Sequence, residues 1–308
     1  MKIENKSYIK NILILAGGSS PEKDICKQSG LIVFGWLEKE GFKARIEDPA
    51  ELSEHQLKEA IVWSDYVIIR DEDGYQQKIA EQLERPFMGA GSRASSICYS
   101  KIQFRRYLPD NIKTPKFQLV TSVSEFKKGL ETLNSNGYVL KSVLGGSSID
   151  IIISNDKSYD EPRVAILIER YRELILEEKI EGIEATVGIY LKDALPVIEI
   201  IPPNGEFFDY NNKYNGNTVE NCPPKNITKE FQLKMQEVAL SVHFSTGCKD
   251  LSRVDMILDE NNEIYVLEIN TIPGMLPGSL YPKAVAESGM TMQEALVGII
   301  NNYKYLNI

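Results

Sequence analysis

The fold of this chain is constrained most by residues 253–282, which begin as a hairpin with one hydrophobic and one polar face. Hydrophobic and polar side chains alternate over residues 252–259, and this period predicts a half-buried strand. Residues 260–262 (Glu-Asn-Asn) supply a turn, and residues 263–270 return as a second strand. The hydrophobic face of the first strand carries Val254, Met256 and Leu258.

The polar face of this hairpin carries side chains that suit magnesium and phosphate. A turn centred between residues 261 and 262 places Asp255 opposite Glu268 and Arg253 opposite Asn270. Mg²⁺ takes oxygen ligands and often shares them with substrate phosphates, while a guanidinium can bind a phosphoryl oxygen or a developing oxyanion. The alternative is a half-exposed hairpin whose outer face is simply charged.

The loop after the second strand can return hydrogen-bond donors to these carboxylates. Pro273 and Gly274 end the strand in a tight turn, and Ser279 follows shortly after. Backbone N–H groups and a serine hydroxyl in such a loop form a natural site for an anion.

Two Gly-Gly-Ser-Ser turns are further candidates for anion binding. The first, residues 17–20, separates an apolar strand at 11–16 from a predicted helix at 22–40, whose N-terminus can hold an anion. The second, residues 145–148, precedes a predicted strand at 149–154 and can fold over a triphosphate. Taken alone, each turn is also consistent with a simple tight connection.

The order of predicted elements indicates a mixed α/β and α+β protein of three units. A short strand is predicted over residues 87–88. A helix predicted over residues 93–108 carries Lys101, and residues 202–224 form a long polar loop of the kind that closes over a site. The predicted domains are an N-terminal α/β domain (1–90), a central α+β domain (91–180) and a C-terminal α+β domain (181–308).

Composition limits the classes of function. The chain has 308 residues, a net charge of −9 and a pI of about 5.1, which argues against a nucleic-acid partner. Its 4 cysteines are scattered and it has only 2 histidines, so we expect neither a zinc site nor a Cys–His nucleophile. Unpaired thiols, with no signal peptide and no membrane-spanning run, indicate a cytoplasmic protein without a membrane partner.

The run E-I-N-T-I-P-G-M, followed by S-L-Y-P, over residues 268–282 resembles the C-terminal motif of D-alanine–D-alanine ligases, a family of the ATP-grasp superfamily. Other motifs of that family follow in the expected order: G-G-x-S-x-E ending at Glu22, E-D-G at 72–74, the loop at 145–148, and F-x-D-Y-x-x-K-Y at 207–214. The resemblance covers nearly the whole chain and implies a three-unit ATP-grasp architecture with ATP between the central and C-terminal units.

Matching these motifs assigns roles to individual residues of this sequence. The residues implied in the reaction itself are Glu22, Ser147, Tyr214, Arg253, Gly274 and Ser279. Those implied in ATP binding are Lys101, Lys141, Ser147, Ser148, Glu177, Glu178, Ile180, Glu184 and Lys213. Those implied in holding Mg²⁺ (or Mn²⁺), with two ions expected, are Asp255, Glu268 and Asn270.

The resemblance implies ATP-dependent peptide bond formation between two D-alanines through an acyl phosphate, for peptidoglycan precursor synthesis. Glu22 would hold the amino group of the first amino acid, and Tyr214 would close over it. Arg253 and the Gly274 N–H would stabilise the tetrahedral oxyanion, and Ser279 would take the carboxylate of the second amino acid. The resemblance also implies a homodimer formed through the N-terminal unit.

Three departures from the family pattern bear on substrate and nucleotide binding. Residues 69–71 (Ile-Arg-Asp) stand where the family has H-G-x-x-G, Ser142 replaces a proline, and Asp150 replaces the last glycine of the phosphate loop. A carboxylate beside phosphates is repelled unless it points away. Two alternatives therefore stay open: a ligase for other amino acids, and a non-catalytic ATP-binding homologue.

Overall fold

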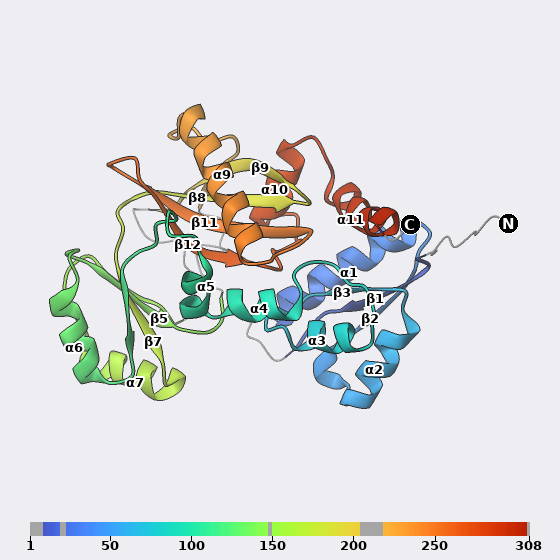
Figure 1. The fold of residues 1–308 in the computed structure, drawn as a ribbon, viewed down its shortest axis with the longest axis horizontal. Helices are drawn as coiled ribbons and strands as arrows, with labels where there is room; N and C mark the ends of the chain where they lie inside the picture. Colours follow the sequence, from blue (N-terminus) through green and yellow to red (C-terminus); the bar gives the residue numbers. More distant parts are fainter. Residues whose placement is uncertain (1–8, 19–22, 147–149, 204–217, 307–308) are drawn as a thin grey trace.

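The computed structural model describes residues 9–18, 23–146, 150–203 and 218–306, which form three sheets with their helices (Figure 1). Each sheet lies within one of the three predicted units, while the unit boundaries near residues 90 and 180 stay a prediction. Within the described ranges, no helix combines the length and the apolar composition needed to cross a bilayer.

The N-terminal sheet is parallel and is covered by helices on both faces. Its strands, in the order β2–β1–β3, are β1 (Asn11–Leu15), β2 (Lys43–Glu47) and β3 (Tyr66–Ile69). Its helices are α1 (Lys23–Lys39), a 3-10 turn (Pro49–Glu51), α2 (Glu54–Trp63) and α3 (Tyr75–Gln82). Ile12 and Ile14 share a core with α1, whereas Leu13 and Leu15 share one with α2 and α3. Burial on both faces explains why β1 and β3 are continuous hydrophobic runs.

The central unit is a four-stranded antiparallel sheet with helices on one face. Its strands, in the order β4–β7–β5–β6, are β4 (Phe117–Val120), β5 (Tyr138–Ser142), β6 (Ile152–Ser154) and β7 (Leu174–Glu178). The helices that cover it are α6 (Val123–Thr132) and α7 (Glu161–Tyr171). Leu140 points into this helix-covered core, so alternation turns Lys141 to the open face.

The C-terminal unit is a five-stranded antiparallel sheet in the order β10–β9–β8–β11–β12. Its strands are β8 (Gly182–Tyr190), β9 (Asp193–Ile201), β10 (Val219–Asn221), β11 (Leu251–Asp259) and β12 (Ile264–Asn270). Its helices are α9 (Lys229–Ser245), α10 (Leu280–Glu287) and α11 (Met292–Leu306). The predicted hydrophobic face of β11 packs under α9, with Val254 and Met256 fully buried.

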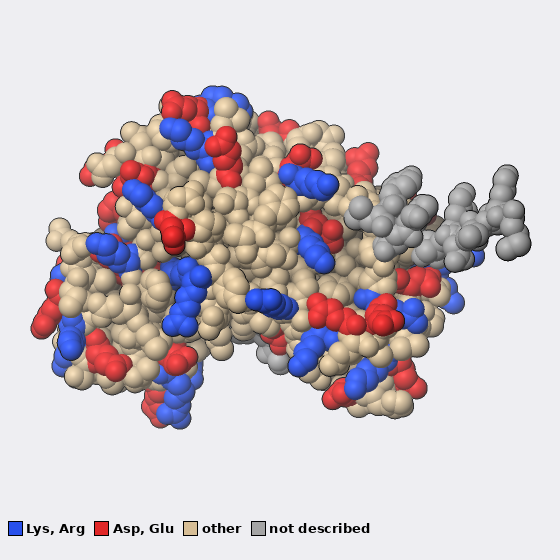
Figure 2. Space-filling model, in the orientation of Figure 1, with Lys and Arg blue, Asp and Glu red and all other residues tan. Residues whose placement is uncertain are grey.

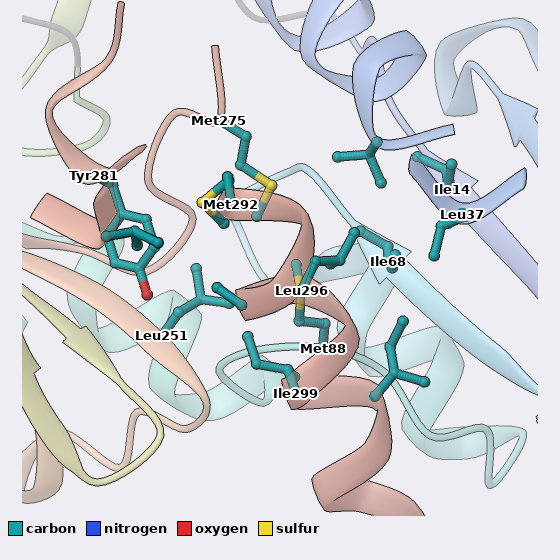
Figure 3. Packing of buried hydrophobic residues seen from close by; sticks show 14 of the residues in the cluster. Ile14, Leu37, Ile68, Met88, Leu251, Met275, Tyr281, Met292, Leu296 and Ile299 are labelled. Atoms are coloured by element: carbon teal, nitrogen blue, oxygen red, sulfur yellow. The ribbon is translucent and has the colours of Figure 1, made fainter. Parts of the chain in front are cut away.

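Helix α11 joins the N-terminal and C-terminal units. Leu296 and Ile299 of α11 lie between Ile68 of the N-terminal sheet and Leu251 of β11, in one continuous hydrophobic cluster (Figure 3). Met275, from the loop after β12, is fully buried in the same cluster. The N-terminal unit is therefore held against the loop that carries the candidate catalytic groups.

Three predicted elements differ from the structure. The helix expected over residues 93–108 is two helices, α4 (Ser92–Tyr99) and α5 (Lys101–Tyr107), because Ser100 leaves helical geometry to bridge Leu144 and to cap α5. The strand expected over 149–154 begins only at Ile152. The short strand expected at Phe87 is a single bridge to Val67.

Charged side chains of both signs are interspersed on the face of the molecule drawn in Figure 2. Nucleic-acid-binding proteins typically gather lysine and arginine into a stripe or patch. On this face, the described residues form no continuous stripe of that kind.

Candidate active site

The hairpin of β11 and β12 gathers the predicted metal and oxyanion residues on one face. Arg253 pairs with Asn270 and Asp255 pairs with Glu268, which confirms the predicted register. Arg253 donates to Asp255 through Nε at 2.9 Å and Nη2 at 2.8 Å, and Thr186 of β8 donates to the same carboxylate at 2.6 Å. The carboxylate of Asp255 is thus fixed in orientation from two strands.

A bulge brings this register about, and the sequence did not predict it. Near the turn Leu258 pairs with Ile264, so the turn is centred on Asn261 and not between residues 261 and 262. The register shifts between Asp255 and Met256, which leaves Leu267 as an extra residue on β12. The predicted pairs are therefore correct although the predicted turn centre is wrong.

Arg253 remains charged within this site. Its side chain is buried, and burial by itself lowers the pKa of the guanidinium. The negative charges of Asp255 and Glu268 outweigh that penalty and raise the pKa overall. The site therefore keeps a permanent cation beside its two carboxylates.

A buried ion-pair cluster lies on the opposite wall, in the central sheet. Glu177 of β7 is 2% exposed and pairs with Lys141 at 2.9 Å and with Arg105 of α5. Burial raises the pKa of Glu177, but the charges of Lys141 and Arg105 lower it overall. Its side chain therefore orients Lys141. Arg105 also stacks on Phe117, and no sequence motif indicated that it would pair with Glu177.

Lys101 stands at the start of α5 and is buried. Its backbone N–H donates to Val143 at 2.9 Å, and its ammonium donates to the carbonyl of Gly145, in the second glycine turn, at 2.6 Å. Burial lowers its pKa to about 8, while Glu268 offsets part of that effect. The break at Ser100 produces this position, because it ends α4 and turns Lys101 toward the loop.

One cavity lies between the central and C-terminal sheets and contains most of the predicted ATP residues. The predicted residues that line it are Lys101, Lys141, Glu177, Glu178, Ile180, Glu184, Asp255 and Glu268. Apolar walls come from Val139, Ile153 and Leu267. Apolar walls together with charged groups suit a nucleotide base and its phosphates.

A second cavity of about 310 Å³ adjoins the first and is bounded by all three units. The predicted residues that line it are Lys101, Arg253, Glu268, Asn270, Gly274 and Ser279. Its volume lies at the lower end of the roughly 300–1,000 Å³ typical of small-ligand sites. Both cavities are lined by Lys101, Ser142, Gly146 and Glu268. Groups bound in the two cavities would therefore meet at Lys101 and Glu268.

The loop after β12 presents hydrogen-bond donors to this second cavity. Ser279 is the residue before α10, and its hydroxyl makes no capping hydrogen bond. Gly274 lies directly against it, since a Cβ added to Gly274 would stand 2.8 Å from the Ser279 Oγ. Asn270 accepts from the Ile272 N–H at 2.9 Å and fixes the start of the loop.

The residues of the hairpin fit a magnesium ion that shares its ligands with phosphate. Asp255 and Glu268 supply carboxylates and Asn270 supplies an amide oxygen, which are the hard donors that Mg²⁺ prefers. Among the described residues, no group of three or more His, Cys, Asp or Glu side chains could hold a metal by itself.

Asp150 points away from the candidate phosphate site. Its carboxylate accepts from Arg170 at 2.5 Å and from the Tyr171 hydroxyl at 2.6 Å. These hydrogen bonds lower its pKa, although partial burial opposes them. The repulsion expected from the sequence is thus relieved by a cation and a hydroxyl from α7.

The segment that replaces the family's H-G-x-x-G lies in the wall of the second cavity. Arg70 and Asp71 of that segment line it, as does Glu72 of the E-D-G motif. Burial raises the pKa of Asp71, and its carboxylate accepts from Gln76 at 3.0 Å. The remaining predicted residues, Glu22, Ser147, Ser148, Lys213 and Tyr214, lie outside the described residues.

Comparison with known proteins identifies the family to which this chain belongs. A family model described as "D-ala D-ala ligase C-terminus" matches residues 110–301. Among sequence relatives, the D-alanine–D-alanine ligase of Clostridium perfringens is 32% identical, covering 96% of this chain and 98% of the relative. That of Buchnera aphidicola is 30% identical, covering 94% and 98%.

Among solved structures, the D-alanine–D-alanine ligase of Bacillus anthracis complexed with ATP superposes with a TM-score of 0.78 at 26% identity, covering 98% of this chain and 100% of that one. The VanG D-Ala:D-Ser ligase of Enterococcus faecalis superposes with a TM-score of 0.80 at 24% identity, covering 96% and 100%, and shows the shared fold. The three sheets and the cavity between the second and third define an ATP-grasp architecture. Within that class, the chain belongs to the D-alanine–D-alanine ligase family.

Proposed function

We propose that this protein is an ATP-dependent ligase that joins two D-alanines into D-alanyl-D-alanine, releasing ADP and phosphate, for peptidoglycan precursor synthesis. The observation that carries the proposal is the sharing of Lys101 and Glu268 by the two adjoining cavities. A nucleotide in one cavity and a carboxylate in the other would meet at these residues. No protein nucleophile is required, because positioning and electrostatics can carry phosphoryl transfer.

In the first step, the carboxylate of the first D-alanine attacks the γ-phosphate of ATP and gives an acyl phosphate. Lys101 and Lys141 balance phosphate charge, and Lys141 is held in place by the buried Glu177. Asp255, Glu268 and Asn270 would hold Mg²⁺, which would supply charge neutralisation and alignment of the phosphates.

In the second step, the amine of the second D-alanine attacks the acyl carbonyl, and phosphate leaves. Arg253 and the Gly274 N–H stabilise the oxyanion of the tetrahedral intermediate. Ser279 binds the carboxylate of the second D-alanine, since its hydroxyl is not used to cap α10.

The proposal also covers the domain organisation, the oligomeric state and the cellular location of the enzyme. We propose three domains with boundaries near residues 90 and 180, a homodimer formed through the N-terminal unit, and a cytoplasmic location where ATP is supplied. The free thiols of Cys26, Cys98, Cys222 and Cys248 support a reducing compartment.

A second candidate is a ligase for other amino acids. It is favoured by Arg70 and Asp71, whose charges line the second cavity (called the amino-acid cavity below) in place of the family's H-G-x-x-G. Charged groups at that wall would suit a substrate with a polar side chain.

ADP release from Mg-ATP, measured with D- and L-amino acids singly and in pairs, distinguishes these functions. Release with D-alanine alone, together with dipeptide, supports the main proposal. Release with another pair only supports the second candidate. Bound ATP without turnover across the panel would support a non-catalytic homologue and contradict both.

A further inference from the structure

Arg70 links the N-terminal sheet to the candidate catalytic loop. It follows β3 directly, and its backbone is anchored in the sheet, because its N–H donates to Leu15 and its carbonyl accepts from the Cys26 thiol. Its Nη2 donates to the carbonyl oxygen of Pro273 at 3.1 Å, across 203 residues of sequence. Arg70 and Gly274 both line the amino-acid cavity.

The hydrogen bond from Arg70 fixes the orientation of the peptide bond between Pro273 and Gly274. Among the described residues, the cis peptide bond is the one between Cys222 and Pro223. The Pro273–Gly274 peptide is therefore trans. In a trans peptide the C=O and the following N–H point in opposite directions within one rigid plane. Fixing the Pro273 oxygen on Arg70 therefore directs the Gly274 N–H away from Arg70. Among the described residues, that N–H has no protein acceptor.

We infer that Arg70 is a positioning residue that holds the Pro273–Gly274 peptide with its N–H aimed at the oxyanion of the second chemical step. The inference rests on the proposed function, and it gives a role to a residue where the family pattern has a different segment. A pre-oriented donor costs no reorganisation as charge develops, which makes its orientation matter for the rate.

The loop has other anchors, so loss of Arg70 should change the peptide's orientation more than the loop's position. Met275 is fully buried in the cluster shared with α11, and Asn270 holds the Ile272 N–H. A mere tether between the units would instead affect stability and both chemical steps alike.

The test compares Arg70→Met with Arg85→Met in the intact enzyme. Arg85 is a matched control, because its Nη2 also donates to a backbone carbonyl, that of Val62, at 3.1 Å, and it does not line either cavity. We expect Arg70→Met to lower kcat for dipeptide synthesis about ten- to a hundredfold, less than the roughly 10²–10³-fold lost when an oxyanion donor is removed. KM for ATP should stay within about twofold, and Arg70→Lys should recover part of the rate since it retains a donor.

Isotope exchange within ATP distinguishes a role of Arg70 in orienting the Pro273–Gly274 peptide from a purely structural role. Reversible acyl-phosphate formation scrambles a label between the bridging and non-bridging oxygens of the β-phosphate. We expect the ratio of scrambling to net dipeptide formation to rise in Arg70→Met, because only the second step is slowed. Equal rates in Arg70→Met and wild type, or a parallel fall of both steps, would overturn the inference alone. No dipeptide from the wild-type enzyme would overturn the proposed function and this inference with it.

Discussion

The proposed ATP cavity, between the central and C-terminal sheets, and the proposed amino-acid cavity, bounded by all three units, differ in which parts of the chain form their walls. The ATP cavity is formed mainly by strands of two sheets, and Glu177 and Lys141 pair with each other in its wall. The amino-acid cavity takes residues from all three units, including Arg70. The departure at residues 69–71 lies in its wall, whereas Asp150 is neutralised outside both cavities. The ATP cavity thus depends on the packing of two units, and the amino-acid cavity on the packing of all three.

The largest effect is expected where the two cavities meet. Glu268→Gln should lower turnover about a thousandfold or more while ATP still binds, because a metal-holding carboxylate is lost. Steady-state kinetics and ATP titration measure the two quantities. Glu263→Gln is the control on the same hairpin, since that carboxylate pairs with Lys113 at the surface. Near-normal turnover in Glu268→Gln would show that the cavities do not join at this residue.

Removing one partner of the buried ion pairs in the wall of the ATP cavity should mainly lower the stability of the folded protein. Glu177→Gln leaves Lys141 and Arg105 without their buried counter-charge and should lower the free energy of unfolding by roughly 3–5 kcal/mol. Denaturant unfolding measures it, with half-buried Glu178→Gln as the control.

The pH dependence of unfolding tests the same pairing. Because the pKa of Glu177 is lowered in the folded state, its stabilisation is present above its reference value of 4.5 and is lost as pH falls through the lower folded value. Glu177→Gln should remove this acid-dependent part. An unchanged acid dependence would contradict the proposed pairing.

Lys101 should make ATP binding depend on pH in a moderately alkaline range. Its pKa is about 8, and the charged form attracts phosphate, so ATP affinity should fall as pH rises through that value, by up to about tenfold per unit. Binding isotherms between pH 7 and 9 measure the effect. Lys101→Arg should flatten the profile, because a guanidinium stays charged; a profile equally steep in that variant would assign the titration elsewhere.

The smallest effect is expected at Asp150. Asp150→Gly restores the family residue at a position with φ of +54°, and it should change KM for ATP by less than about twofold. Arg170→Ala should raise that KM more, since it frees the Asp150 carboxylate to approach the phosphates. The reverse order of the two variants would show that Asp150 acts on the nucleotide even when paired.

The residues that lie opposite one another in the β11–β12 hairpin could be predicted from the local sequence pattern. Strand alternation and a short turn determine which side chains share a face, so Arg253, Asp255, Glu268 and Asn270 could be placed opposite one another. The bulge at Leu267 could not, because it depends on how the strands twist against their neighbours.

The sequence by itself determined the family, the order of elements and the residues of the hairpin, because motifs and period-two alternation are local properties. Only the tertiary structure decided the break at Ser100 that turns Lys101 into the site, the pairing of Glu177 with Arg105, and the contact between Arg70 and Pro273. Each depends on two segments that are distant in the sequence and meet only in the folded chain. No local sequence pattern specifies such contacts, so only the tertiary structure shows them.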